Sequence, residues 1–142
     1  MSQRFSTHTY VRAVYAPSGR AAIEISRGSA ARAIELLEPA ARYELGFRFL
    51  FLSGYLRGQA YLRARQGLQA AAEFQKILDH RGAAPVSPRY ALAHLGLARA
   101  HALAGDAPKS RKAYQDFLAL WKDADPDIPI LQEAKREYAA LK

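Results

Sequence analysis

The sequence contains no cysteine, so disulfide bonds, thiolate zinc sites and a cysteine nucleophile are all excluded. Long apolar runs are also missing, since the longest stretch, Phe47 followed by Phe49–Leu52, is interrupted by Arg48. A membrane-spanning helix needs about 20 apolar residues, and the N-terminal residues lack the apolar stretch of a signal peptide. We therefore expect no membrane insertion and a cytoplasmic location.

Acidic residues are outnumbered by basic ones, 13 against 21, which gives a net charge of +8. A basic balance is typical of proteins that bind nucleic acids, anionic membrane surfaces or acidic partners. The arginines are spread along the whole chain, and no block of five like charges occurs. This scatter favours an ordinary solvated surface over a nucleic-acid footprint.

Alternating strand patterns are absent, and alanine and leucine dominate, which indicates an all-α protein. Glycine, proline and capping residues divide the chain at Gly28-Ser29, Arg65-Gln66-Gly67 and Gly105-Asp106-Ala107-Pro108. Ser87-Pro88 begins a further helix by the same reasoning, and the Ser29 side chain is expected to cap a helix N-terminus. The predicted helices span residues 9–27, 29–41, 47–65, 68–80, 88–104, 107–121 and 129–141.

An internal repeat emerges when Tyr55–Leu78 is aligned with Leu95–Leu118, and a weaker copy ends in Gly28–Leu37. In each copy a small residue of the first helix lies twelve positions before a small residue of the second, and a bulky residue follows four positions later. Small residues allow two helices to approach closely, and the bulky residue lies on the same helix face. The three sets are Ala21, Ala33 and Leu37; Gly58, Ala70 and Phe74; and Ala98, Ser110 and Tyr114.

These positions resemble the tetratricopeptide repeat, whose pattern has a Leu-Gly pair, a Tyr three residues on, and then Ala, an aromatic residue and Ala in the second helix. The second copy places Gly58, Tyr61, Ala70, Phe74 and Ile77 there. The resemblance implies an all-α fold of one domain, residues 1–142, in which antiparallel helix hairpins stack into a right-handed α-solenoid. Its expected parts are repeats at about 10–41, 47–80 and 88–121 and a capping helix at about 129–141.

A narrower resemblance concerns the segment AEFQKILDHRG and the ending AYQDFLALWKDADPDIPILQEAKREYAAL. Both look like the C-terminal tetratricopeptide region of bacterial multidomain serine/threonine kinases or winged-helix regulators. The chain itself has no Gly-rich phosphate loop, no His-Arg-Asp segment and no other catalytic motif. We therefore predict a detached interaction or sensor portion of a larger signalling protein, with no enzyme activity and no cofactor.

In the tetratricopeptide family the first helix of each repeat lines a concave groove that holds a peptide or a partner protein. Transferred position by position, the resemblance predicts groove residues in the second and third repeats: Leu52, Tyr55, Gln59, Leu62, Arg63, Leu92, Leu95, Arg99, Ala102 and Leu103. Arg63 and Arg99 give this groove a positive character, so an acidic peptide would suit it. The alternative is that the leucines and tyrosine of this set pack against neighbouring repeats.

Further interpretations stay open beside the groove, and one of them is a purely structural module whose function lies in a domain removed from this chain. Helical repeats that read RNA make a basic nucleic-acid-binding module the alternative function, although their polar reading positions are mostly Leu and Ala here. The segment Phe47–Leu56 is either an interface for homo-oligomerisation or a bulky core between the first two repeats.

Two patterns imitate metal sites. His94 and His101 share a helix face, but no third ligand has suitable spacing. The aspartates Asp123, Asp125 and Asp127 begin like a calcium loop, which would require Gly and Glu where Ile128 and Ala134 stand. We therefore predict no metal and a helix-capping turn at the aspartates.

Overall fold

The computed structural model describes residues 9–44, 51–83 and 87–141. These residues contain seven α-helices and no strand, which confirms the all-α prediction. The helices are α2 (Ala16–Ser26), α3 (Ala30–Leu37), α4 (Leu52–Arg63), α5 (Gly67–Asp79), α6 (Pro88–Leu103), α7 (Ala107–Leu120) and α8 (Pro129–Ala140). Shorter helical turns are the π-helix η1 (Val11–Tyr15) and the 3₁₀ helices η2 (Glu38–Tyr43) and η3 (Arg81–Ala83).

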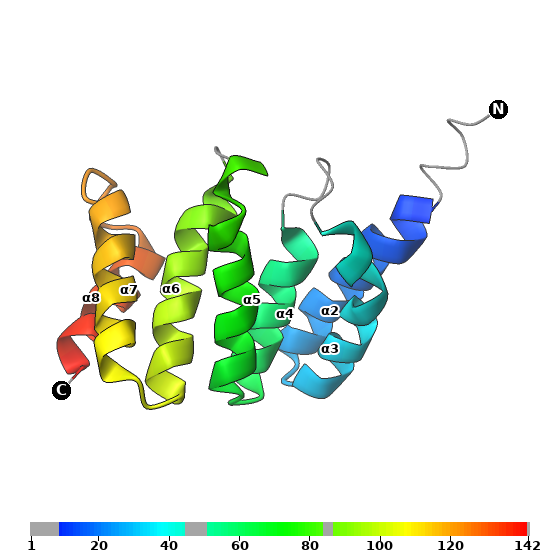
Figure 1. The fold of residues 1–142 in the computed structure, drawn as a ribbon, viewed down its shortest axis with the longest axis horizontal. Helices are drawn as coiled ribbons and strands as arrows, with labels where there is room; N and C mark the ends of the chain where they lie inside the picture. The colour runs from blue at the N-terminus through cyan, green and yellow to red at the C-terminus, as the bar shows by residue number, and fades with distance from the viewer. Residues whose placement is uncertain (1–8, 45–50, 84–86, 142) are drawn as a thin grey trace.

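The helices lie side by side in chain order along the longest axis of the molecule (Figure 1). Each helix packs against the next, and α4 also contacts both α2 and α6. The turns that join α2 to α3, α4 to α5 and α6 to α7 all lie along the same long edge of the array, at the bottom of Figure 1. Consecutive helices therefore run antiparallel, and the first helices of the three hairpins form one layer.

Two prolines change the predicted helix geometry. The helix predicted at residues 9–27 is continuous, but it is wound as a π-helix before Pro17, and the Ala16 N–H bonds to the Val11 carbonyl. The helix predicted at 29–41 is α-helical only to Leu37 and continues as 3₁₀ through Pro39. Proline has no N–H to donate and its ring crowds the preceding turn, so regular α-helical bonding fails at both places.

The hairpin turns follow the predicted chemistry in part. Gly28 and Gly105 adopt left-handed backbone conformations, with φ of 83° and 77°, and the Asp106 side chain accepts a bond from the Lys109 N–H at 3.1 Å. The Ser29 side chain makes no capping bond, which corrects that prediction. In the middle turn Arg65, with φ of 57°, takes the left-handed conformation instead of Gly67.

Gly67 allows the start of α5 to pack closely against α6. A Cβ atom there would lie 2.7 Å from the Ala100 carbonyl oxygen and 2.8 Å from the Ala104 nitrogen, both backbone atoms of α6. Because backbone atoms cannot rotate away, only glycine permits this approach of α5 to α6.

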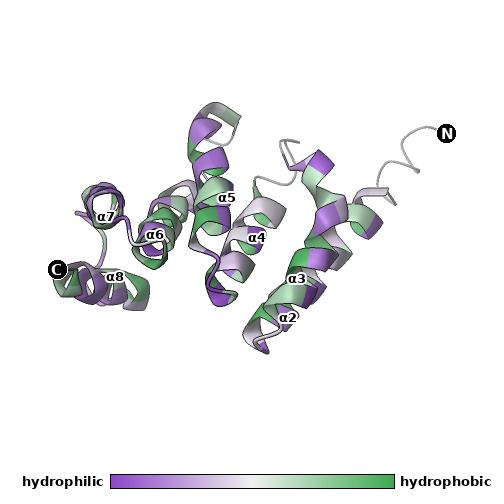
Figure 2. Ribbon diagram, turned by 60° about the horizontal axis from the view of Figure 1, so that its bottom comes forward, coloured by the Kyte–Doolittle hydropathy of each residue, from purple (hydrophilic) through white to green (hydrophobic). Residues whose placement is uncertain are grey.

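The small and bulky residues of the three repeat sets are all buried in the structure, whereas the repeat tyrosine Tyr61 is half-buried. Bands of apolar and polar colour alternate along the helices, as expected where only one face is buried (Figure 2). Ser110 donates its hydroxyl to the Ala98 carbonyl at 2.8 Å and so joins the two small residues of the third copy. Phe74 lies against both Gly58 and Gly96, where an added Cβ would approach the ring to 2.7 Å and 2.5 Å. The bulky residue of the second copy therefore fills the space between α4 and α6.

The apolar segment at residues 47–56 is described only from Phe51 onward. Phe51 is buried in the core that α5, α6 and α7 share, and Leu56 packs against the core of the first hairpin. Leu56 therefore contributes to the core between the first two hairpins, as the second of the two interpretations stated, whereas Phe51 belongs to the core of the second and third hairpins. Residues 47–50 lie outside the described residues.

Candidate interaction surface

Helix α4 presents most of its predicted groove residues in half-buried positions. Leu52, Tyr55, Gln59 and Leu62 are all partly accessible, and Arg63 is exposed. The Tyr55 ring meets Phe74 edge-on, with centroids 5.9 Å apart, so the core fixes its position. Burial raises the pKa of Tyr55, and its hydroxyl therefore remains a neutral hydrogen-bonding group at physiological pH.

Helix α6 contributes less than the sequence predicts. Leu92 and Leu103 are half-buried, and Ala102 is exposed, but Leu95 is only 1% exposed and belongs to the core. Since α6 is packed against α4, α5 and α7 at once, little of its circumference remains free. Leu95 therefore offers no surface to a partner in this structure.

Arg99 is engaged by the last helix. Its guanidinium forms two hydrogen bonds of 2.9 Å with the Glu137 carboxylate, and Glu133 lies 3.3 Å away. Tyr114 donates its hydroxyl to Glu137 at 2.7 Å, which ties α6, α7 and α8 together. Burial, assisted by this bond to Glu137, raises the pKa of Tyr114. The positive charge that the sequence assigned to a groove at this residue is thus neutralised within the chain.

A second charged group, which the sequence analysis missed, joins the first two hairpins. Arg57 of α4 is buried and donates to the carboxylates of Glu44 and Glu73, the latter at 2.9 Å, and to the Leu37 carbonyl at 3.4 Å. Lys76 approaches the same carboxylates at 3.4 Å and 3.2 Å. The sequence indicates only that Arg57 lies next to Gly58, a repeat position expected to face inward, and it does not indicate the two carboxylates that Arg57 meets.

His94 and His101 line a shallow pocket of about 350 Å³ between α5, α6 and α7. The pocket is bordered by Gln75, Leu78, His94, Leu97, His101, Lys109, Lys112, Ala113 and Asp116. Lys109 is paired with Asp106 at 2.9 Å, and Lys112 is paired with Asp116. Within the described ranges, no three side chains of the metal-ligating types come together.

These histidines make folding stability sensitive to acid. Burial lowers the pKa of His94 and of His101 below the ordinary value of 6.5; around His94, Asp116 opposes this shift while Lys112 and Arg81 add to it. The unfolded chain then binds protons more readily than the folded one, so this contribution to stability is complete above the ordinary pKa and declines as the pH falls through the lowered one. In urea titrations at decreasing pH across this range, the free energy of unfolding should fall more for the wild type than for a His94→Gln, His101→Gln variant. His80→Gln, at an exposed site, is the control and should behave like the wild type. An equal fall in the double variant would show that these two histidines do not cause the acid sensitivity.

The aspartate run forms the predicted turn, but no aspartate caps α8, because its N-cap residue is Ile128 and no side chain makes a capping bond there. The Asp125 carboxylate accepts the Asp127 N–H at 3.0 Å, and the Ile128 N–H bonds to the Asp125 carbonyl at 3.2 Å. This Asx-type turn directs the chain into α8, which begins at Pro129.

The chain was compared with family models, curated proteins and solved structures, and none of them matches. The part of the chain that the structure describes has no helix with the length and apolarity needed to cross a bilayer. The fold therefore defines an all-α protein of packed helix hairpins.

Proposed function

We propose that this chain is a protein-interaction scaffold of the tetratricopeptide type, which binds a peptide or partner protein on the face formed by α2, α4 and α6. In this proposal the three hairpins stack with a right-handed superhelical twist, and the face becomes the concave groove of a solenoid. The contacts of α4 with both α2 and α6 support this arrangement. Helix α8 caps the stack, because its Glu137 closes over Arg99 and Tyr114.

The observation that carries the proposal is the juxtaposition of half-buried apolar side chains on two contacting helices. Leu52, Tyr55 and Leu62 lie on α4, Leu92 and Leu103 lie on α6, and these two helices contact each other. Side chains that the core holds in place but leaves partly accessible bind with little loss of conformational entropy. A peptide that carries apolar anchors suits such a face.

Arg63 determines the expected charge of the partner. It is exposed at the end of α4 and makes no ion pair with any residue in the described ranges. Arg99, by contrast, already holds a carboxylate of α8. We therefore expect a partner whose apolar anchors are followed by one acidic group near Arg63, and the resemblance to repeats of kinases and winged-helix regulators supports a role in signalling.

Binding of RNA is the alternative function. The internal pairing of Arg57 and Arg99 lowers the number of arginines that could meet phosphates. The predicted groove residues on α4 and α6 are mostly leucines, and Arg63 is the exposed arginine among them. Such a surface suits a peptide better than a polyanion.

A peptide-display selection against the wild-type protein tests the proposal. Selected peptides should contain apolar and acidic residues, and their affinity should fall about tenfold in Arg63→Glu and in Leu92→Asp, measured by fluorescence anisotropy. Arg111→Glu, an exposed arginine of α7, is the matched control and should leave the affinity unchanged. The proposal would be overturned if neither substitution changed the affinity of the selected peptides. It would also be overturned if an RNA pool bound tightly and Arg63→Glu weakened that binding.

A further inference from the structure

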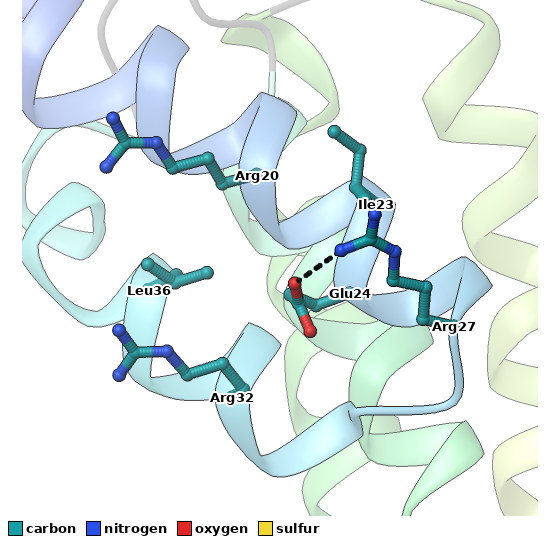
Figure 3. Close-up of a pocket in the computed structure, with 6 residues that line it drawn as sticks. All are labelled: Arg20, Ile23, Glu24, Arg27, Arg32 and Leu36. Carbon is teal, nitrogen blue, oxygen red and sulfur yellow. Dashed lines mark ion pairs between the residues drawn. The ribbon is translucent and has the colours of Figure 1, made fainter.

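A separate pocket lies between α2 and α3, in the first hairpin. It has a volume of about 290 Å³ and is lined by Arg20, Ile23, Glu24, Arg27, Arg32 and Leu36. In Figure 3 the guanidinium groups of Arg20 and Arg32 lie on the same side of the pocket, with Leu36 between them. Arg27 is directed toward Glu24 and forms an ion pair of 3.6 Å with it.

This pocket lies on the side of the hairpin that faces away from α4. The inward positions of α2 and α3 are Ala21, Ala33 and Leu37, which are inaccessible and pack with Ala60 of α4. Ile23 points the other way because it lies about 200° around the helix from Ala21, and Arg20, about 100° from Ala21, is exposed beside it. Ile23 is 51% exposed, so its side chain is accessible to a partner.

The charges in the pocket are unevenly matched. Glu24 is paired with Arg27, and Glu35 is paired with Arg32 at 2.8 Å. Arg20 has no ion-pair partner within residues 9–44, 51–83 and 87–141. Residues 1–8, which precede this hairpin, include no Asp or Glu. The pocket thus has one unmatched positive charge beside an apolar floor of Ile23 and Leu36.

We propose that this pocket is a second docking site, which binds an acidic segment of a partner protein. A carboxylate of the segment pairs with Arg20, and the Arg32 guanidinium can join it because its own pair with Glu35 is exposed to solvent. An aliphatic side chain next to that carboxylate rests on Ile23 and Leu36. The pocket shares helix α2 with the binding face proposed above, but it contains none of the residues on α4 and α6 that carry that proposal and that are called the α4–α6 face below.

Charge complementarity selects this occupant over two others. Stacking of a second copy end to end would bring α8 toward the first hairpin, and α8 exposes Lys135 and Arg136 as well as Glu133, a mixed set of charges that complements the arginines less well than an acidic segment does. A nucleic acid would place phosphates near Glu24 and Glu35, whose carboxylates already offset two of the three arginines. A single carboxylate on an apolar stem matches the unmatched charge and the apolar floor.

The test uses a short fluorescein-labelled peptide that alternates leucine with glutamate, together with a second peptide in which lysine replaces glutamate. The wild-type chain should bind the glutamate peptide saturably and the lysine peptide weakly. Arg20→Glu and Arg32→Glu should each weaken binding of the glutamate peptide about tenfold, while Arg20→Glu strengthens binding of the lysine peptide. Both arginines are exposed, so both variants should keep the wild-type circular dichroism and melting temperature.

Arg65→Glu, at the exposed turn after α4, is the charge-matched control and should bind like wild type. Loss of binding in Arg63→Glu and Leu92→Asp, with Arg20→Glu unaffected, would assign the peptide to the α4–α6 face and overturn the second site. Absence of saturable binding to the wild-type chain would overturn it as well. A single-stranded RNA that binds more tightly than the peptide, and that Arg20→Glu weakens, would replace the acidic segment with a nucleic acid.

Discussion

Replacing Phe74 with alanine should lower the free energy of unfolding by about 3–5 kcal/mol, the range for truncating a large buried aromatic side chain. The ring is inaccessible and lies between Gly58 of α4 and Gly96 of α6, with Tyr55 against its edge. Neither glycine has a side chain that can move into the space, so the cavity remains open. Urea unfolding followed by circular dichroism measures the change.

The same helix supplies the control for Phe74→Ala. Leu68 is 74% exposed on α5, and Leu68→Ala should change stability by no more than about 0.5 kcal/mol. If Phe74→Ala cost less than about 1 kcal/mol, α4 and α6 would not be packed around this ring.

The same packing predicts a compensating pair of substitutions. Gly96→Ala alone should be destabilising, and adding Phe74→Leu should restore part of the lost stability, because the smaller side chain leaves room for the added methyl group.

Arg57→Ala should be equally costly, at about 3–5 kcal/mol, because it leaves two carboxylates without their main partner in a buried site. Glu44 and Glu73 would face each other across the space of the guanidinium, with only Lys76 to offset them. The Leu37 carbonyl would also lose its bond from α4. Since these partners lie in α3, directly after η2 and in α5, the substitution should weaken the attachment of the first hairpin to the second.

Two variants separate the buried network from general effects of removing an arginine. Arg63→Ala, on the exposed side of the same helix, should change stability by no more than about 0.5 kcal/mol. Arg57→Met together with Glu44→Leu and Glu73→Leu should recover most of the loss, because an apolar set leaves no buried charge unpaired. A small effect of Arg57→Ala in urea titrations would mean that water already reaches these carboxylates.

The packing of the hairpins was predictable because it follows local rules. Small residues twelve positions apart, such as Ala98 and Ser110, identify the helix crossings, and the bulky residue four positions later identifies the filling of the core. The turn at Gly105-Asp106 was equally readable, since a left-handed glycine and an aspartate cap act within a few residues. Local chemistry decides these features before the chain is folded.

The charged contacts were not predictable, because they join residues that only the fold brings together. Arg99 was assigned to a peptide-binding groove on its repeat position, but its position relative to Glu137 depends on how α8 returns over α6. Arg57 needed the positions of Glu44 and Glu73, one on each side of it in the chain. Likewise, the pocket at Arg20 and Ile23 depends on which side of the first hairpin α4 covers.

The most direct test of the proposed function is to map a display-selected peptide by amide chemical shifts in two-dimensional NMR spectra of the labelled protein. The largest amide shifts should fall on α4 and α6, with small shifts on α5 and α7. Their centre should be at Tyr55, Leu62, Arg63 and Leu92. Large shifts confined to α3, α5 and α7, on the opposite layer of the array, would contradict a binding face formed by the first helices of the hairpins.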